Sequence, residues 1–495
     1  MATVQTNDAR VEYAANLIDS ISDCDDNARS YIFISKVTPW EDDNSPPVPD
    51  NSIKEFYDVY HELLSLKRLY DGNAFHMLPR FKWQSGTTFD MYRHDYSPTN
   101  LANSGGKNLF ECVWFVINQN NDVYVCLDNA QNQPSIIEPQ NQSYDPFYTS
   151  DGYQWMRVFK IGNFALLNYS TQNFIPITSD GANLDNFVRT DGEINTVVID
   201  SPGANYTSNP GGVPNQVTNY YCKIVGDGMG AVANVRVIGG RIMEIRVARA
   251  GSAYTYAKLD FRANHVYRSL ADLDQQVNGL NPQGDGTFQS TCIISPPDGW
   301  GYNLPRQLGG IRVGVFSSLN YQLTDFFPDV EFRQIGILQD PVPSPILPEN
   351  PDTMSGVYAY TVAGVAGVDD FFIGEEIYQS QFDPVTSRTH NARGQVVGWD
   401  ADDQILRYVQ IPSKHVDLDG NLYQFQAGDF IRGKQSNKLV EPFAFTGSLE
   451  GLNFVNGFAD KEIVEYTGKI TYLSNITPIQ RQPTQTERIS LIISF

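Results

Sequence analysis

Apolar residues along this sequence recur mainly at every second position, in short runs separated by glycine, proline, asparagine and aspartate. The final segment, "ERISLIISF", is typical, because four apolar side chains fall on one face: Ile489, Leu491, Ile493 and Phe495. A period of two is the pattern of a β-strand with one buried face. Comparable runs occur at residues 31–37, 113–117, 123–127 and 153–161. The pattern therefore predicts a mainly β protein.

Helical spacing is found in two segments near the N-terminus. Ser52 is a good N-cap, and Glu55 three residues later completes the pattern of a capping box. Apolar side chains then recur at intervals of three and four, which predicts a helix over residues 52–67. A weaker pattern of the same kind predicts a helix over residues 9–22.

One phrase of the sequence occurs twice. Residues 194–207 read "INTVVIDSPGANYT" and residues 242–255 read "IMEIRVARAGSAYT", an offset of 48 residues (242 − 194). Alternating runs and glycine-rich turns lie between the copies, so residues 191–262 are expected to form a small β-meander. Two copies are too few for a solenoid.

Both copies end in the turn Gly-x-x-Tyr-Thr. We expect Gly203 and Gly251 to supply a positive φ, and Tyr206 and Tyr254 to fold back over the turn and cover the apolar face. Together with Tyr256, these tyrosines are also candidates for stacking on sugar rings.

A second segment, residues 352–460, contains short alternating runs separated by Asp-Gly, Asp-Ala-Asp and Ala-Gly turns. This spacing is typical of a small β-barrel or sandwich. The rest of the chain would then form a body built from three parts: residues 1–190, 263–351 and 461–495.

Length and charge narrow the possible partners. The chain has 495 residues, more than the ~250–300 at which single cores stop growing, so several packed units are expected. With 35 basic and 57 acidic residues, the net charge is −22. Such a surface repels phosphate backbones and anionic lipids, so neither nucleic acid nor membrane is expected as a partner. No secretory signal pattern is visible at the N-terminus. We therefore expect the protein to remain in the cytoplasm where it is made, or to leave by a route other than secretion.

The five cysteines are scattered and form no CxxC pair. They are expected to be reduced and packed as small apolar residues. The runs at 113–117 and 123–127 predict a β-hairpin on a Gln-Asn-Asn-Asp turn. Cys112 and Cys126 flank this hairpin and could lie close together. The five are Cys24, Cys112, Cys126, Cys222 and Cys292.

Two glycine-rich motifs suggest ligand sites but fit turns better. "GDGMGA" at residues 226–231 resembles half of a dinucleotide fingerprint, but an alternating β pattern follows it instead of the required helix. "HVDLDGN" at residues 415–421 has two carboxylates of a calcium loop and lacks the remaining ligands.

No pattern of catalytic residues stands out. The histidines are dispersed, and no GxSxG elbow occurs. Adjacent acids occur at 42–43, 369–370 and 375–376, but a glycosidase needs two carboxylates brought together by the fold. We therefore expect no enzymatic activity, no catalytic, cofactor or metal site, and no small-molecule substrate. The histidines are His61, His76, His94, His265, His390 and His415.

Five stretches, in order, resemble a known family. They read "YIFISKVTPW…SPPVPDNS", "MLPRFKW", "EPQNQSYDPFYTSDGYQWMRVFKI", "FPDVEFRQIGIL" and "TGKITYLSNITPIQ…QTERISLIISF". The series is similar to the baseplate wedge subunit of T-even-type contractile-tailed phages, the gene-product-eight class. The resemblance covers about residues 1–165, 300–345 and 461–495. The chain has Ile476-Thr477 where the family commonly has Arg-Pro, so contacts of that arginine are not expected here.

The resemblance implies a β-sandwich body with helix-bearing N-terminal loops and no catalytic site. It also implies paired copies (a homodimer) that contact other baseplate wedge subunits in the virion tail baseplate, which is assembled in the host cytoplasm. The segments 191–262 and 352–460 fall where the resemblance lapses, and we interpret both as inserted modules. The alternative function is that of a glycan-binding or glycan-degrading phage tail protein.

Overall fold

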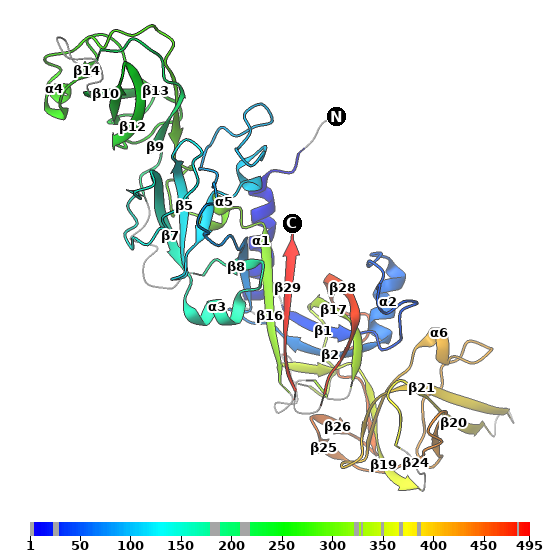
Figure 1. The fold of residues 1–495 in the computed structure, drawn as a ribbon. Coiled ribbons are helices and arrows are strands. Elements are labelled where there is room, and N and C mark those ends of the chain that lie inside the picture. Colours follow the sequence, from blue (N-terminus) through cyan, green and yellow to red (C-terminus); the bar gives the residue numbers. More distant parts are fainter. Residues whose placement is uncertain are drawn as a thin grey trace. The chain divides into compact units, whose positions relative to one another are not determined.

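The predicted mainly β fold is confirmed. The structure is a computed structural model (Figure 1). Among the residues that the structure describes, strands account for 42% and helices for 11%. The described residues are 4–22, 29–178, 189–207, 218–320, 326–327, 330–347, 351–365, 370–383, 388–482 and 485–495.

The chain divides into two compact units. The first consists of Met1–Ala15, Phe75–Gly314 and Ile492–Phe495, and the second of Asn16–Ala74 and Val315–Leu491. Four elements pass from one unit into the other: α1 (Asn7–Ser22), β3 (Ala74–Pro79), β16 (Arg312–Asn320) and β29 (Thr486–Ser494). The predicted helix over 9–22 is thus confirmed as α1, and the predicted last strand as β29.

The first unit has an aromatic core around a four-stranded antiparallel sheet with the order β4-β5-β7-β6. The predicted hairpin is present, since β4 pairs with β5. Trp114, Trp155 and Trp300 are completely buried in this core. The strands are β4 (Phe115–Ile117), β5 (Asp122–Asn129), β6 (Phe147–Tyr148) and β7 (Tyr153–Lys160).

Short elements surround this sheet: η1 (Leu109–Glu111), α3 (Asn163–Tyr169), β8 (Phe174–Pro176) and α5 (Leu304–Leu308). Strand β8 belongs to a further sheet of order β29-β16-β3-β8.

The doubled phrase forms strands β9 (Ile194–Ser201) and β12 (Arg241–Arg249). The two strands have different hydrogen-bonding partners, because β12 lies in the sheet β12-β11-β10-β13 whereas β9 pairs with β15. One apolar core nevertheless includes side chains from Ile194 to Ile294, so the cluster extends past residue 262. The other elements are β10 (Thr218–Gly226), β11 (Val232–Ile238), β13 (Ala257–Leu259), β14 (Val266–Tyr267), α4 (Leu270–Gln275) and β15 (Gln289–Ile294).

The two copies are related by an internal pseudo-twofold. Residues of β9 and β12 that lie 48 positions apart take equivalent places in the β9–β15 and β12–β11 pairings. Both pairings also shift register at equivalent residues. The copies also exchange equivalent backbone hydrogen bonds. Ile194 N donates to Ala250 O and Ile242 N donates to Pro202 O, while Tyr254 N donates to Gly192 O and Tyr206 N donates to Gly240 O. Each copy therefore closes the turn of the other.

The second unit contains a five-stranded sheet of order β18-β2-β1-β17-β28. Strand β1, predicted at residues 31–37, spans Ser30–Ser35, and its side chains are buried on both faces. The other strands are β2 (Leu63–Arg68), β17 (Glu331–Gln339), β18 (Thr353–Ser355) and β28 (Lys469–Gln480).

The predicted helix over 52–67 is wrong in its second half. Helix α2 covers Ile53–His61, and the following residues form β2. Ser52 caps the helix as expected by accepting a bond from Glu55 N, but the Glu55 carboxylate accepts from Asp50 N and Asn51 N. Leucines that would extend the helical stripe lie instead in a strand between β1 and β18, where both faces are buried.

Residues 358–459 form a closed barrel. The strands are ordered β22-β21-β20-β23-β24-β19, with β27 next to β19, and β22 also pairs with β19. Closure removes free sheet edges from the ring. The elements are β19 (Tyr358–Val365), β20 (Glu376–Asp383), β21 (Arg388–Asp400), β22 (Ile405–Val409), α6 (Pro412–His415), β23 (Ile431–Gly433), β24 (Leu439–Pro442), β25 (Gly447–Leu449), β26 (Leu452–Phe454) and β27 (Phe458–Ala459).

Candidate functional site

The histidines are used individually in local contacts. His61 contacts the Tyr466 hydroxyl at 2.8 Å, and His265 lies 2.8 Å from Asp260. His415 is buried, and its Nδ1 accepts a hydrogen bond from Ile411 N at 2.8 Å. In the part of the chain that the structure describes, the one group of three possible metal ligands contains no histidine. It consists of Asp400, Asp403 and Glu450.

The described members of the three adjacent acid pairs bind different partners. Asp43 pairs with Arg333. Glu375 is buried and accepts bonds from the backbone of three residues: Phe372, Gln435 and Ser436. Glu376 pairs with Lys434, and Asp370 pairs with Lys438, while Asp369 lies outside the described residues.

The four described cysteines are buried and free, and Cys24 lies outside the described residues. Burial raises the pKa of the Cys112 thiol to about 11 and that of Cys292 to about 12. Because the thiolate is the reactive form, these side chains behave as small apolar residues.

The glycine-rich motifs form turns, as predicted. In "GDGMGA", Asp227 accepts hydrogen bonds from Thr255 N and Tyr256 N. The side-chain hydrogen bond from Thr255 is the largest cause that lowers the pKa of Asp227 to about 2. In "HVDLDGN", the Asp417 carboxylate accepts from Asp419 N and Asn421 N within a tight turn.

The repeated turns have the predicted backbone geometry. Gly203 and Gly251 have φ values of 60° and 69°. A second residue with positive φ follows in each copy, Asn205 at 63° and Ala253 at 60°.

Two of the three tyrosines proposed for sugar stacking are not available for it. Tyr206 is 7% exposed and Tyr254 is 3% exposed, whereas Tyr256 is 64% exposed. Each buried ring covers a glycine so closely that a Cβ would overlap it: Tyr206 covers Gly284, and Tyr254 covers Gly228. The two rings therefore serve as core packing for the repeated turn.

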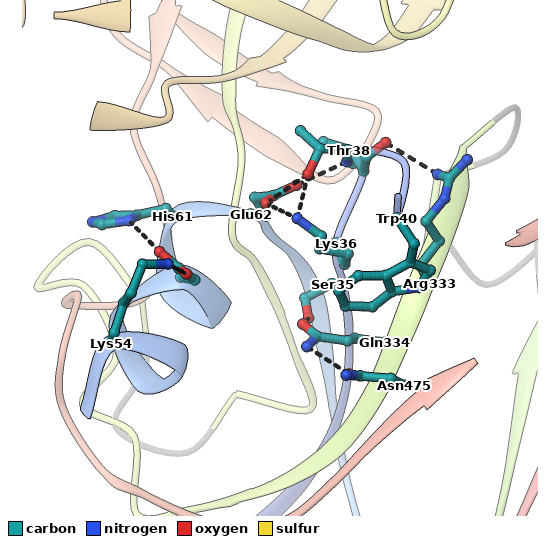
Figure 2. Close-up of polar contacts among 12 residues, drawn as sticks. Ser35, Lys36, Thr38, Trp40, Lys54, His61, Glu62, Arg333, Gln334 and Asn475 are labelled. Atoms are coloured by element: carbon teal, nitrogen blue, oxygen red, sulfur yellow. Dashed lines mark hydrogen bonds and ion pairs between the residues drawn. The ribbon is translucent and has the colours of Figure 1, made fainter. Parts of the chain in front are cut away.

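A buried polar network fastens the loop after β1 (Figure 2). The Glu62 side chain is 5% exposed, and its carboxylate accepts from Lys36 Nζ at 2.7 Å and from Thr38 N at 2.8 Å. These contacts join the start of the loop to Glu62, the residue that directly follows α2.

Arg333 of β17 holds the middle of the same loop. Its guanidinium makes a bidentate pair with Asp43, with both distances at 2.8 Å, and donates to Val37 O at 3.1 Å. The Arg333 hydrogen bond is the largest cause that lowers the pKa of Asp43. Planar bidentate pairs of this kind fix geometry as well as charge.

A third chain of contacts extends from β1 to β28 (Figure 2). Ser35 Oγ donates to Gln334 Oε1 at 3.0 Å, and Gln334 Nε2 donates to Asn475 Oδ1 at 2.7 Å. Asn475 donates in turn to Pro47 O, and Trp40 Nε1 donates to Ile476 O. Ile476 stands at the position where the resembling family commonly has arginine, and it contributes its backbone carbonyl to the contact with Trp40.

A cavity of about 510 Å³ lies against the barrel. Four aromatic residues line it: Tyr358, Tyr360, Phe425 and Phe458. Tyr358 and Phe458 are half-buried and stacked at 6.0 Å, with 22° between their planes. Exposed polar side chains at its rim include Gln424, Gln426 and Asp460.

Buried glutamines hold one wall of this cavity. Gln379 is completely buried, and its Nε2 donates to Gln426 O and Asp429 O, while its Oε1 accepts from Gln426 N. Gln381 Nε2 donates to Gln424 O. The backbone of residues 423–429 pairs with no strand, so these glutamine side chains supply its hydrogen-bond partners.

A buried hydroxyl near the cavity has no hydrogen-bond partner. Tyr408 is completely buried, and its hydroxyl oxygen is unpaired. Its ring stacks on Tyr358 at 5.5 Å and on Tyr360 at 6.2 Å. Burial raises the pKa of Tyr408, and Tyr360, Tyr358 and Asp460, which line the cavity, raise it further through their charge.

This cavity was hard to predict from the sequence, because its aromatic residues come from segments far apart in the chain and only the barrel pairing brings them together. Tyr358 lies opposite Tyr408 in one strand pair, and Tyr360 lies opposite Phe458 in another. Alternating aromatics at 358 and 360 were the available clue to a shared face.

The comparisons with known proteins found no match: neither a family model nor a curated protein is similar to this sequence. None of the described helices combines the length and the apolar character needed to cross a lipid bilayer.

Proposed function

We propose that this protein is a structural baseplate wedge subunit of a contractile-tailed bacteriophage. It acts through protein–protein interfaces in baseplate assembly and tail contraction, without catalysis. Its partners are other wedge subunits and a second copy of itself, and its location is the virion tail baseplate, assembled in the host cytoplasm.

One observation supports this proposal most directly. Three of the five segments that resemble the wedge family, although far apart in the sequence, contribute strands to one sheet. Strands β1, β17 and β28 are adjacent, and the Ser35–Gln334 and Gln334–Asn475 bonds span 299 and 141 positions of the chain. A resemblance due to chance would have no reason to collect in one packed and hydrogen-bonded region.

The arrangement of this region suits a structural scaffold. The loop of residues 36–51 contains neither helix nor strand, yet it is held at Glu62, Arg333 and Asn475. A loop held in this way offers a preformed surface to a neighbour and loses little conformational entropy on binding.

Purified phage particles from the source provide the test. Mass spectrometry should find this chain at a fixed ratio to the other baseplate proteins, and immunogold labelling should mark the end of the tail. Particles that contain a full baseplate but lack the chain would refute the proposal.

The alternative, a glycan-binding tail protein, loses two of its three original candidates because Tyr206 and Tyr254 are buried, whereas Tyr256 is exposed. The aromatic cavity of the barrel provides a different reason to consider saccharides.

A further inference from the structure

We propose that the cavity at the barrel, lined by Tyr358 and Phe458, binds a neutral saccharide. This inference does not depend on the proposed function, since a wedge subunit and a protein of another kind could both carry such a site. Its volume of about 510 Å³ lies within the roughly 300–1,000 Å³ typical of ligand pockets.

The aromatic side chains form a continuous surface of a kind that sugars recognise. Phe458 stacks on Tyr358, and its ring centroid lies 5.1 Å from that of Tyr360. The face of an aromatic ring is electronegative. The C–H groups on the face of a pyranose carry partial positive charge and therefore pack favourably against it.

Polar groups stand where sugar hydroxyls need partners. Gln424, Gln426 and Asp460 line the cavity and are exposed, which places amide and carboxylate groups within reach of a ligand. Asp460 Oδ1 also accepts a hydrogen bond from Lys461 N at 2.8 Å, which fixes the orientation of this carboxylate.

The charge of the cavity selects against anionic sugars. Among the described residues that line it, Asp460 is the one that carries a charge. The ammonium group of Lys461 lies over the Tyr358 ring, and it is paired with Glu465. A carboxylate or sulfate on the sugar would therefore meet repulsion from Asp460 without a compensating cation.

The wall of the cavity is organised before any ligand binds. The bonds from Gln379 and Gln381 fix the backbone of Gln424 and Gln426, whose side chains form the rim. A site that is already ordered gives up less conformational entropy on binding. This is a physical reason for the burial of Gln379 and Gln381 in the barrel.

The test is a calorimetric or NMR titration of the full chain with cellotriose, maltotriose, chitotriose and lactose, each up to about 10 mM, where a millimolar Kd is still measurable. Saturable binding to at least one of these is expected, and 3′-sialyllactose should bind more weakly than lactose. Saturation by none of the neutral sugars, or equal binding of the anionic one, would overturn the proposal.

Variants locate the binding to this cavity. Phe458→Ala should weaken binding by about tenfold or more, the cost of one lost aromatic contact. Since this change also removes packing, Gln426→Ala at the exposed rim gives an independent measure, with a loss of severalfold expected. The matched control is Phe382→Ala, which removes an exposed phenylalanine from the outward face of β20 and should leave affinity unchanged.

Tyr408→Phe tests the packing behind the cavity. The hydroxyl makes no bond in the protein, so its removal should leave the melting temperature unchanged or higher. Tyr408 is completely buried and does not line the cavity, so saccharide affinity should also stay unchanged. Binding at the wild-type level in both Gln426→Ala and Phe458→Ala would show that any sugar binds elsewhere and would refute the proposal.

Discussion

Several buried polar side chains of this protein fasten irregular backbone. Glu375 binds three backbone N–H groups, and Gln379 binds both polar groups of the Gln426 backbone. Buried polar groups are tolerated when they are fully paired. At this scale, Glu375 and His415 are explained by the backbone groups that they hold.

His415 should make the protein sensitive to acid. Burial lowers the pKa of His415 from 6.5 to about 4, so the unfolded chain binds a proton at a higher pH than the folded one. Stability from this residue is complete above pH 6.5 and is lost as the pH falls toward 4, by up to about 1.4 kcal/mol per pH unit. Urea unfolding at several pH values measures this slope.

The control for this prediction is His415→Asn, whose Oδ1 can still accept the Ile411 N–H but does not titrate. The nearby charged groups Glu376, Lys414, Arg393 and Glu62 remain in the variant. An identical pH slope in the variant and the wild type would contradict the assignment.

Gly251 should tolerate no side chain. Its φ is 69°, and a Cβ would lie 2.6 Å from both Ala231 N and Met229 O. Gly251→Ala should therefore lower the free energy of unfolding by about 2–5 kcal/mol, the sum of a left-handed backbone and overpacking. Gly286 has a similar φ of 76° with open space around it, so Gly286→Ala should cost only about 1 kcal/mol. Denaturant unfolding that gives equal losses would show that crowding is unimportant.

At the scale of elements, the sequence predicted strands better than it predicted their partners. The alternation at residues 194–199 and 242–247 indicated β9 and β12, but it carried no information about whether these strands pair with each other. The leucines after His61 fitted a helix for a simple reason. A strand that is buried on both faces is apolar at successive positions, so some of its apolar residues also lie three or four positions apart. The sheet around them, formed by residues 30–35 and 353–355, decided the outcome.

The barrel wall offers a prediction at this scale. Gln379→Leu should leave Gln426 N without its acceptor, so the segment of residues 423–429 should open more readily while the barrel strands stay protected. Hydrogen–deuterium exchange should speed up at Gln426 and leave β21 and β22 unchanged. Ser380→Ala, at the neighbouring exposed position, serves as the control. Unaltered exchange at Gln426 in Gln379→Leu would mean that other contacts hold the wall.

At the scale of the whole molecule, the barrel begins and ends at adjacent points of the second unit. Ser355 N donates to the Glu462 carboxylate at 2.7 Å, and Glu462 N donates to Ser355 O at 2.8 Å. The expected module of residues 352–460 has boundaries near these two residues. Because these two points are close, a short linker can join them at little cost in loop-closure entropy.

Replacing residues 357–460 with a short Gly-Ser linker should therefore leave the sheet β18-β2-β1-β17-β28 folded. Circular dichroism and thermal unfolding of this variant should show a cooperative transition. Replacing residues 191–262 in the same way is the comparison, and it should be more damaging, because it removes β9 from its partner β15. A barrel deletion without a cooperative transition would show that the sheet needs the barrel to fold.

The reciprocal bonds between the two copies of the repeat have a consequence for the history of the chain. Tyr206 N reaches Gly240 O in the same way that Tyr254 N reaches Gly192 O, which is the self-complementary contact of a twofold dimer. Gene duplication and fusion of a shorter ancestor would produce this arrangement. Within one chain, the association of the two halves is independent of protein concentration, and a substitution can change one half without altering the other.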